Sequence, residues 1–309
     1  MPQQTKPLTA YQTTIGEFIE QLNKRDTTKR TYKEALGNWN TFANEEAPNV
    51  DVELVEAYKT HLTREKYSPY TIGVYLTALK LFFDYLVSKG VLQINPAEHI
   101  ERNKKPKSRR ESLTEEEFFR LIELDSPQNK LELRDRAILM LKMCAGLRDI
   151  SIVRTDVGDI RTKGGVAVLY HQGKGRDSKD EFVVLTTRVF KTLTDYLNQR
   201  PAAKPADPLF ISGSKRNRNQ RITSKTIYRA IKNFFKLVQI KRPGITPHSL
   251  RHTAVTFAIL GGADVPQVQD MAGHKHIETT MEYRHNLERL TDPAEQYIER
   301  YIEKHQKQL

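Results

Sequence analysis

A ten-residue interruption of the apolar pattern divides this chain into two segments, each of which must build its own core. Residues 101–110 read Glu-Arg-Asn-Lys-Lys-Pro-Lys-Ser-Arg-Arg. They include six basic side chains, one acidic side chain and one proline, and apart from the proline none of them is apolar. Such a composition is typical of a linker. Because 309 residues suffice for about two domains, we predict a flexible N-terminus at 1–12, a first domain at 13–100, a basic linker at 101–111 and a second domain at 112–309.

The first segment shows helical periodicity. Ile15, Phe18, Ile19 and Leu22 recur at spacings of three and four residues, which places them on one face of a helix that begins near Thr14. Similar patterns follow at 28–44, 51–66 and 69–89. Since no part of the segment alternates with a period of two, we expect a small all-helical domain.

The second segment mixes helices and strands. Thr114 and Glu117 have the spacing of a capping box, and a helix over 134–145 is expected to end at Gly146. Residues 166–170 and 182–185 are rich in β-branched and aromatic side chains, which predicts two strands. Further helices are expected at 224–239, 247–260, 266–272 and 277–290, and a last one begins at Asp292 and Pro293. The predicted fold is therefore mainly α with a small β-sheet.

The charge of the chain favours a polyanionic partner. Fifty Lys and Arg residues stand against 38 Asp and Glu residues, and residues 211–242 carry ten basic side chains with no acidic one. Repulsion within this stretch would destabilise a free surface unless phosphates offset it, so we predict binding to nucleic acid. The predicted phosphate contacts come from the linker and the start of the basic stretch: Lys104, Lys105, Lys107, Arg109, Arg110, Lys215, Arg216, Arg218, Arg221 and Lys225.

Several other classes of protein do not fit the sequence. The single cysteine, Cys144, cannot form an intrachain disulfide, and residues 1–6 lack the apolar core of a signal peptide. The most apolar run, 137–145, contains Lys142 and is too short to cross a bilayer. We therefore expect neither secretion nor a membrane-spanning protein.

A cluster of histidines raises the possibility of a metal site. His248 and His252 are four residues apart, as in zinc proteases, but the intervening residues are Ser-Leu-Arg and the Glu that such proteases need is missing. A cation beside the second His disfavours a metal ion, so we predict none. An anion fits better, because His248 and Arg251 share a face of a helix that Pro247 starts.

Other motifs in the second segment carry polar side chains of similar chemistry. Arg148 follows a predicted helix end, Lys174 lies in a Gly-Lys-Gly turn, and His274 and Tyr283 lie further along the chain. Each residue taken alone also fits an ordinary structural role.

Together, in order and spacing, these motifs resemble the tyrosine recombinase (phage integrase) family. The similarity runs through Ala145-Gly146-Leu147-Arg148, Gly173-Lys174-Gly175, His248-Ser249-Leu250-Arg251-His252-Thr253, Leu260-Gly261-Gly262-Ala263-Asp264-Val265, Gly273-His274 and Thr279-Thr280-Met281-Glu282-Tyr283. The helical first segment is similar to the SAM-like core-binding domain of Xer-like members. The resemblance implies a helical core-binding domain followed by a mixed α/β catalytic domain.

The resemblance also implies a function. Members break and rejoin DNA strands through a covalent 3′-phosphotyrosine, with no metal, ATP or other cofactor. Tyr283 matches the nucleophile, Arg148 and Arg251 the phosphate-binding arginines, His248 and His274 the hydrogen-bond donors, and Lys174 the hairpin lysine that protonates the leaving 5′-oxygen. The implied partners are double-stranded DNA and a homotetramer on two DNA sites, with no membrane, and the implied location is cytoplasmic and nucleoid-associated.

Two departures from the family pattern leave alternatives open. Family members usually have an acidic residue three positions after the first arginine, and this position is Ser151 here. The alternative function is therefore that of a catalytically weakened DNA-binding protein with the same fold. The hairpin is longer by two residues than the common pattern, so Lys179 competes with Lys174. Integration or excision of a mobile element and Xer-type dimer resolution are both compatible with the motifs.

For the remaining residues we predict structural roles. Trp39, Phe82, Phe83, Phe234 and Phe235 are expected in the cores, and Cys144 is expected to be a small buried apolar residue. The final helix carries an apolar stripe formed by Tyr297, Ile298, Tyr301 and Ile302. The stripe packs on its own core or, as we favour, docks on a neighbouring protomer.

Overall fold

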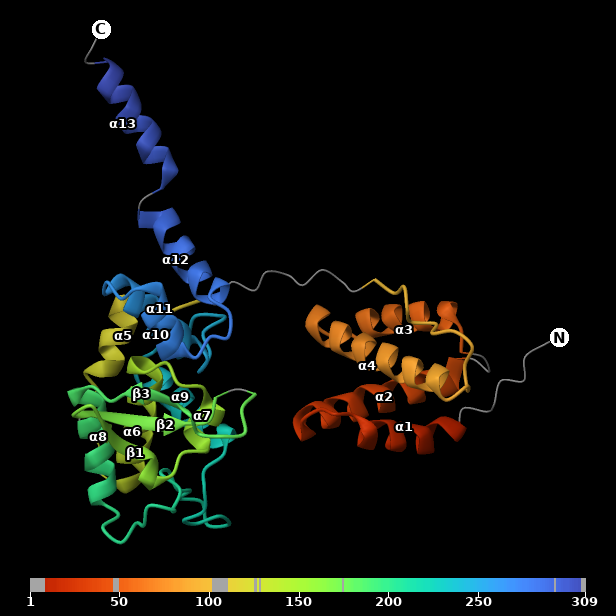
Figure 1. Cartoon of the computed structure of the whole chain (residues 1–309), viewed down its shortest axis with the longest axis horizontal. Helices are drawn as coiled ribbons and strands as arrows, with labels where there is room; N and C mark the ends of the chain where they lie inside the picture. The colour runs from red at the N-terminus through yellow and green to blue at the C-terminus, as the bar shows by residue number, and fades with distance from the viewer. Residues whose placement is uncertain are drawn as a thin grey trace, which may run out of the picture. The chain divides into compact units, whose positions relative to one another are not determined.

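The computed structural model describes residues 9–46, 50–101, 111–124, 127, 129–173, 175–291 and 293–306. Several predicted site residues lie outside the described residues: Lys104, Lys105, Lys107, Arg109, Arg110 and Lys174. The chain divides into two compact units, residues 1–108 and 109–309, and the elements of each are labelled in Figure 1.

The first unit is all-helical. It consists of α1 (Thr9–Gln21), α2 (Asp26–Glu46), α3 (Val52–Arg64) and α4 (Pro69–Ser88). Asp51 caps α3 by accepting a hydrogen bond from the Leu54 amide at 2.8 Å, and Ser68 caps α4 in front of Pro69. The helix α1 begins at Thr9 rather than near Thr14, so residues 9–12 are helical. Apolar periodicity located only the buried face of this helix and not its polar first turn.

Aromatic side chains fill the core of the first unit. The ring of Trp39 packs edge-on against Tyr58 at 5.1 Å and against Phe83 at 5.7 Å between centroids, and Phe82 is fully buried. Within the described residues, only α4 is long and apolar enough to cross a membrane, but its apolar side chains form this core. The predicted core roles of Trp39, Phe82 and Phe83 are therefore confirmed.

The second unit surrounds a small sheet with helices. Its elements are α5 (Glu115–Ile122), α6 (Lys130–Cys144), α7 (Asp149–Val153), the 3₁₀ helix η1 (Val157–Asp159), β1 (Ile160–Lys163), β2 (Val166–His171), β3 (Glu181–Val184), α8 (Thr187–Asn198), α9 (Ser224–Leu237), α10 (Ser249–Leu260), α11 (Val265–Ala272), α12 (Glu278–Thr291) and α13 (Ala294–Gln306). The strands form an antiparallel sheet in the order β1-β2-β3, with His171 directly opposite Glu181.

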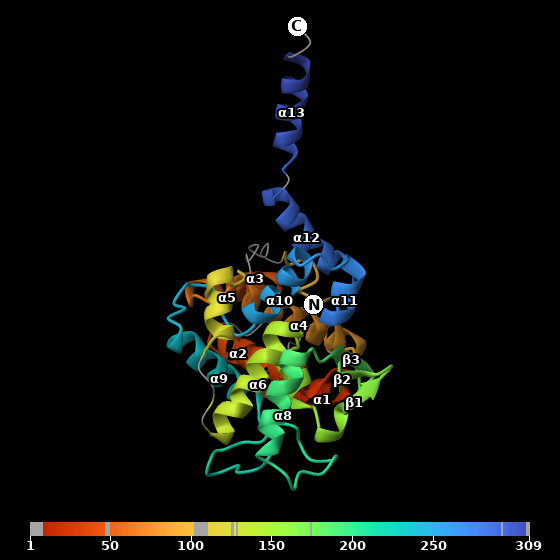
Figure 2. The same cartoon turned by 90° about the vertical axis from the view of Figure 1, so that its left-hand side faces the viewer.

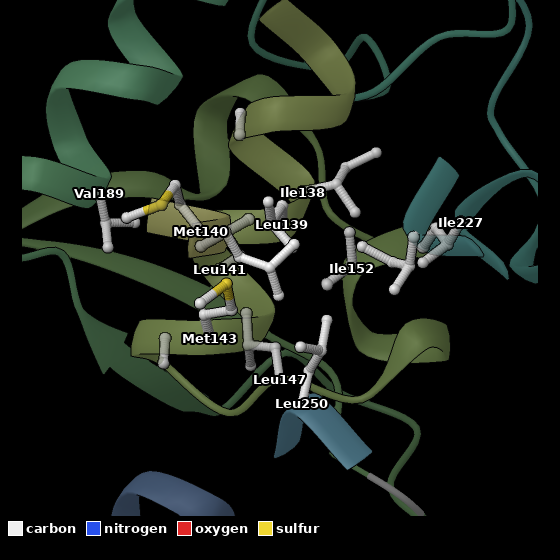
Figure 3. Packing of buried hydrophobic residues seen from close by; sticks show 14 of the residues in the cluster. Ile138, Leu139, Met140, Leu141, Met143, Leu147, Ile152, Val189, Ile227 and Leu250 are labelled. Carbon is white, nitrogen blue, oxygen red and sulfur yellow. The ribbon is translucent and has the colours of Figure 1, made fainter. Parts of the chain in front are cut away.

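The helix α6 is the centre of the second core. Residues 137–141 are fully buried, and they pack among Ile152 of α7, Val189 of α8, Ile227 of α9 and Leu250 of α10 (Figure 3). Figures 1 and 2 both show α6 alongside α8, with which it makes extensive contact. Because α6 contacts α10 as well, this packing fixes the helix that carries the predicted His248 and Arg251.

Most predicted elements of this unit are present, with four additions. The capping box of Thr114 and Glu117 is formed by reciprocal hydrogen bonds of 3.1 and 2.9 Å. The helix α6 begins at Lys130 rather than at 134, because the Asn129 side chain caps it by accepting from two amides. The elements α7, η1, β1 and α8 were not predicted. In β1, Ile160 is partly buried and the other three residues are exposed, so no alternating pattern marks the strand. The predicted mainly α fold with a small sheet is confirmed.

Two smaller expectations about this core can be checked. Phe235 is buried and Phe234 is partly buried against the same cluster, as predicted. Cys144 is half-buried and packs on the core, and burial raises the pKa of its thiol, which opposes a nucleophilic role.

Candidate active site

The helix α10 is the scaffold of the candidate site. His248 caps its N-terminus, while Arg251 and His252 in its first turn are both buried, with 4% of each exposed. Thr253, on the same helix, accepts a hydrogen bond from the Leu113 amide at 2.9 Å, which ties the helix to the start of α5. His248 is exposed, so it can reach a ligand that lies on the surface.

Arg251 connects two loops that carry other predicted site residues. Its Nη1 donates a hydrogen bond of 2.7 Å to the carbonyl of Gly146, and its Nη2 donates to the carbonyl of Ala272. Gly146 lies two positions before Arg148, and Ala272 lies two positions before His274. One buried guanidinium therefore fixes both loops against α10.

Arg148 reaches the same place from the opposite loop. The backbone at Gly146 is left-handed, with a φ of 61°, and this turn ends α6 and leads into α7, which Arg148 caps. Nη2 of Arg148 donates a hydrogen bond of 3.2 Å to the carbonyl of Gly273. Both predicted phosphate-binding arginines are thus anchored to the C-terminal end of α11.

His274 follows that end directly. Gly273 adopts a left-handed φ of 56°, which turns the chain so that Nδ1 of His274 lies 2.8 Å from Oγ1 of the fully buried Thr280. Burial, together with the positive charges of Arg251 and Arg148, lowers the pKa of His274 to about 4. The imidazole is therefore neutral at neutral pH, and its other nitrogen can donate a hydrogen bond when Nδ1 accepts from Thr280.

Tyr283 on α12 completes the cluster. Its ring stacks on His274 with 6.3 Å between centroids and on His252 with 5.6 Å, and its phenol is hydrogen-bonded to Nδ1 of His252. Five of the six predicted catalytic residues, Arg148, His248, Arg251, His274 and Tyr283, therefore lie around the first turn of α10 and the end of α11. The sixth, Lys174, is outside the described residues.

The electrostatics of this cluster favour an anion. Burial first, and then the charge of Arg148, lower the pKa of Arg251 to about 9, which still leaves the guanidinium charged at neutral pH. Burial also lowers the pKa of Arg148. Burial therefore disfavours the charged forms of both arginines. A negative group between the two guanidiniums would offset this penalty, so the site favours an anion.

Sequence reasoning missed three contributors to the site. His252 belongs to a quoted motif, but its contact with Tyr283 depends on how α10 and α12 pack. Lys142 is buried inside α6 and is paired with Asp149, which directly follows Arg148. The third contributor is Glu181 of β3, whose charge raises the pKa of both Arg148 and Arg251 against the effect of burial. Lys142 gave a signal in the sequence as a charge inside an apolar run, and His252 as part of the motif that begins at His248, whereas Glu181 gave none.

The alternative hairpin lysine, Lys179, is engaged elsewhere. Its Nζ lies 2.6 Å from Oδ2 of Asp156 and 2.5 Å from Oδ2 of Asp159. Burial lowers the pKa of Lys179, but the hydrogen bonds and charges of the two aspartates outweigh it and raise the pKa overall. Lys179 therefore anchors the hairpin to the η1 segment.

The predicted phosphate contacts that are described lie on the surface around the start of α9, with one exception. Lys215, Arg216, Arg218 and Lys225 are exposed. Arg221 is half-buried, donates to the carbonyls of Val153 and Thr155, and pairs with Asp156. The first four are accessible to solvent, whereas Arg221 links its loop to the segment that follows α7.

Within the described part of the chain, no group of three or more His, Cys, Asp or Glu side chains could hold a metal ion. The rings of His248 and His252 meet edge-on at 4.8 Å between centroids. The chemistry on offer is that of cations, imidazoles and one phenol.

Comparisons with known proteins agree with this geometry. A profile of the Phage integrase family matches residues 111–289, and one of the Phage integrase SAM-like domain matches residues 12–105. Tyrosine recombinase XerC of Thermodesulfovibrio yellowstonii is 29% identical over 282 residues, covering 88% of this chain and 91% of the relative. XerC of Pelobacter propionicus is 32% identical over 222 residues, covering 71% of this chain and 70% of the relative.

Solved structures show the same fold. The XerH site-specific recombinase bound to palindromic difH substrate has a TM-score of 0.69 at 19% identity, covering 84% of this chain and 78% of that one. A lambda integrase tetramer bound to a Holliday junction has a TM-score of 0.71 at 16% identity, covering 91% and 78%. The predicted family is confirmed: the chain belongs to the phage integrase family and is a Xer-like tyrosine recombinase, an enzyme of site-specific DNA strand cleavage and rejoining.

Proposed function

We propose that this protein recombines DNA at specific sites through a covalent 3′-phosphotyrosine formed on Tyr283. The observation that carries the proposal is the position of the phenol, which is hydrogen-bonded to the residue after Arg251 and stacked on His274. A nucleophile, two guanidiniums and the imidazoles of His248, His252 and His274 thus meet in one site. This is the set that attack on a phosphodiester needs.

In the proposed step the phenol oxygen of Tyr283 attacks the scissile phosphorus. A bond from phosphorus to the phenol oxygen forms and the bond to the 5′-oxygen breaks, so one phosphoester replaces another and no ATP is consumed. A free phenol has a pKa of about 10, so its proton must leave during the attack. Nδ1 of His252 already contacts the phenol and is within reach to accept that proton.

The other residues act on the phosphate and the leaving group. Arg148 and Arg251 bind the non-bridging oxygens, where negative charge grows in the transition state, and His248 and His274 donate further hydrogen bonds. Lys174 gives a proton to the leaving 5′-oxygen. The engagement of Lys179 with two aspartates supports Lys174 in this role.

For the assembly we propose that the two domains clamp double-stranded DNA and that four protomers act on two sites. The first domain, the basic linker and the exposed cations near α9 would contact the phosphate backbone. The apolar stripe of α13 supports contact between protomers, because Tyr297, Ile298, Tyr301 and Ile302 are between 42% and 64% exposed. The lambda integrase tetramer on a Holliday junction is a precedent for such an assembly. We place this recombination in the cytoplasm, on the nucleoid.

The experiment that tests the chemistry uses nicked DNA from beside the gene, which traps the covalent intermediate. We expect a slowly migrating adduct on a denaturing gel with the wild type and with Tyr228→Phe, an exposed tyrosine of α9. Tyr283→Phe should bind the DNA equally well and give no adduct. An adduct with Tyr283→Phe would contradict the nucleophile assignment.

The same experiment separates the rival function and the biological roles. No adduct from the wild type on DNA that it binds tightly would favour a catalytically weakened DNA-binding protein, the alternative that Ser151 suggests. The mapped cleavage position identifies the role: a site at the end of a mobile element indicates integration or excision, and a chromosomal site indicates dimer resolution.

A further inference from the structure

We propose that Glu181 is a positioning residue for Arg148, and that it supplies the carboxylate that the site lacks at Ser151. The proposal rests on the recombinase function proposed above, because it concerns the arginine that would bind the scissile phosphate. Ser151 is 1% exposed, and its Oγ donates a hydrogen bond of 2.9 Å to the carbonyl of Gln172. Ser151 therefore supports the β2–β3 hairpin and brings no charge to Arg148.

Glu181 brings that charge from the hairpin. It is the first residue of β3 and lies opposite the buried His171 at the end of β2. Its Oε1 forms an ion pair with Arg176, with 2.7 Å to Nε. Its Oε2 is buried and has no hydrogen-bond partner among the described residues. A carboxylate oxygen buried in this way is costly unless a positive charge lies close by.

The space around this oxygen leads to Arg148. A Cβ on Gly173 would lie 2.5 Å from Oε2 of Glu181, and a Cβ on Gly273 would lie 3.0 Å from it. The same Cβ on Gly273 would lie 3.7 Å from Nη1 of Arg148. The carboxylate thus occupies the gap that two glycines leave open, and the guanidinium borders the same gap while its Nη2 binds the Gly273 carbonyl.

The arrangement explains what Glu181 does for the site. Its charge faces both arginines and opposes the penalty that burial places on their charged forms. The carbonyl of Gly273 binds Nη2 of Arg148, and the carboxylate of Glu181 attracts the guanidinium across the gap beside Gly273. Two constraints of this kind hold a flexible side chain in one orientation before DNA binds.

The test compares Glu181→Gln with Asp180→Asn, the neighbouring carboxylate that also pairs with Arg176 but is 46% exposed. We expect Glu181→Gln to slow adduct formation on nicked DNA by about tenfold, since small misplacements of a catalytic group have effects of this order, without changing DNA affinity. Asp180→Asn should leave the rate unchanged. Glu181→Asp should retain part of the rate, and Ser151→Glu added to Glu181→Gln should restore it.

A second measurement does not depend on catalysis. The melting temperatures of Glu181→Gln, Arg148→Gln and the double variant form a thermodynamic cycle, in which coupled residues give shifts that do not add. We expect the double variant to lose less than the sum of the two single losses. Additive shifts, or a Glu181→Gln rate equal to that of Asp180→Asn, would overturn the proposal. If no variant and no wild-type sample formed an adduct, the proposed function would fail, and the cycle would still decide whether Glu181 and Arg148 interact.

Discussion

Replacement of Gly273 by alanine isolates the role of the space beside Arg148. The chain offers a matched control, because Gly164 in the β1–β2 turn has a φ of 57° and Gly273 a φ of 56°. An added Cβ has nothing within 4 Å at Gly164. The two substitutions therefore impose the same backbone strain and differ only in what the new methyl group touches.

The expected magnitudes follow from this geometry. A left-handed alanine costs about 1–2 kcal/mol, and in a unit of this size each kcal/mol lowers the melting temperature by about 2–4 °C. Both variants should show that loss. At Gly273 the methyl group also lies 3.0 Å from the Glu181 carboxylate and in contact with Arg148, so the carboxylate must move by a few tenths of an ångström. A shift of this size at the site should slow cleavage by about tenfold.

The assays are thermal unfolding and the rate of adduct formation on nicked DNA. We expect Gly164→Ala to melt earlier than the wild type and to cleave at the wild-type rate. Gly273→Ala should melt at least as early and cleave more slowly. Equal cleavage rates in the two variants would refute the reasoning, because they would show that the position of the carboxylate and of Arg148 does not limit the chemistry.

Three further predictions concern charge. The pKa of His274 is about 4 in the folded protein, against about 6.5 in the unfolded chain. As the pH falls from 6.5 to 4, the unfolded state therefore takes up the proton first, and the free energy of unfolding should fall. We expect a loss of about 1–2 kcal/mol, because the side chain is partly exposed. Denaturant titrations should show a weaker pH dependence in His274→Asn. Asp149→Ala should cost about 3 kcal/mol because it leaves the fully buried Lys142 unpaired, whereas Lys142→Met should be nearly neutral, as thermal unfolding will show. Lys225→Ala should reduce the salt dependence of DNA binding by about one counterion, while Arg221→Ala should instead lower the melting temperature.

The helices that carry the site could be predicted because their signals are local. Residues 247–260 and 266–272 were expected to be helical, and α10 and α11 begin and end within two residues of those bounds. Apolar spacing marks their buried faces, and the glycines at 261 and 273 mark their ends. The motif residues themselves followed from resemblance, and the fold brings the described ones together.

The elements and contacts that the sequence did not predict depend on tertiary packing. The helix α7 has five residues, which is too short for a periodic pattern. Glu181 looks like one more charge in a polar hairpin, and its importance appears only when β3 is placed beside Gly273. The sequence shows that Ser151 stands where family members have an acidic residue. It does not show that Glu181, thirty positions later in the chain, lies near Arg148.

On the proposed mechanism, the balance of charge allows the site to be organised without DNA and still to attract a phosphate. In its described part, Arg148 and Arg251 contribute two positive charges and Glu181 one negative charge. The backbone carbonyls of Gly146, Ala272 and Gly273 hold the guanidiniums in place without neutralising them. Arg176, which pairs with Oε1 of Glu181, adds a third positive charge. The positive charges therefore outnumber the negative one, which favours a phosphodiester with its single negative charge. Without the carboxylate of Glu181, the repulsion between the two arginines would be uncompensated, and each further carboxylate would weaken the attraction for the phosphate. A single carboxylate beside two arginines suits both requirements, whether it comes from the helix after Arg148 or, as here, from β3.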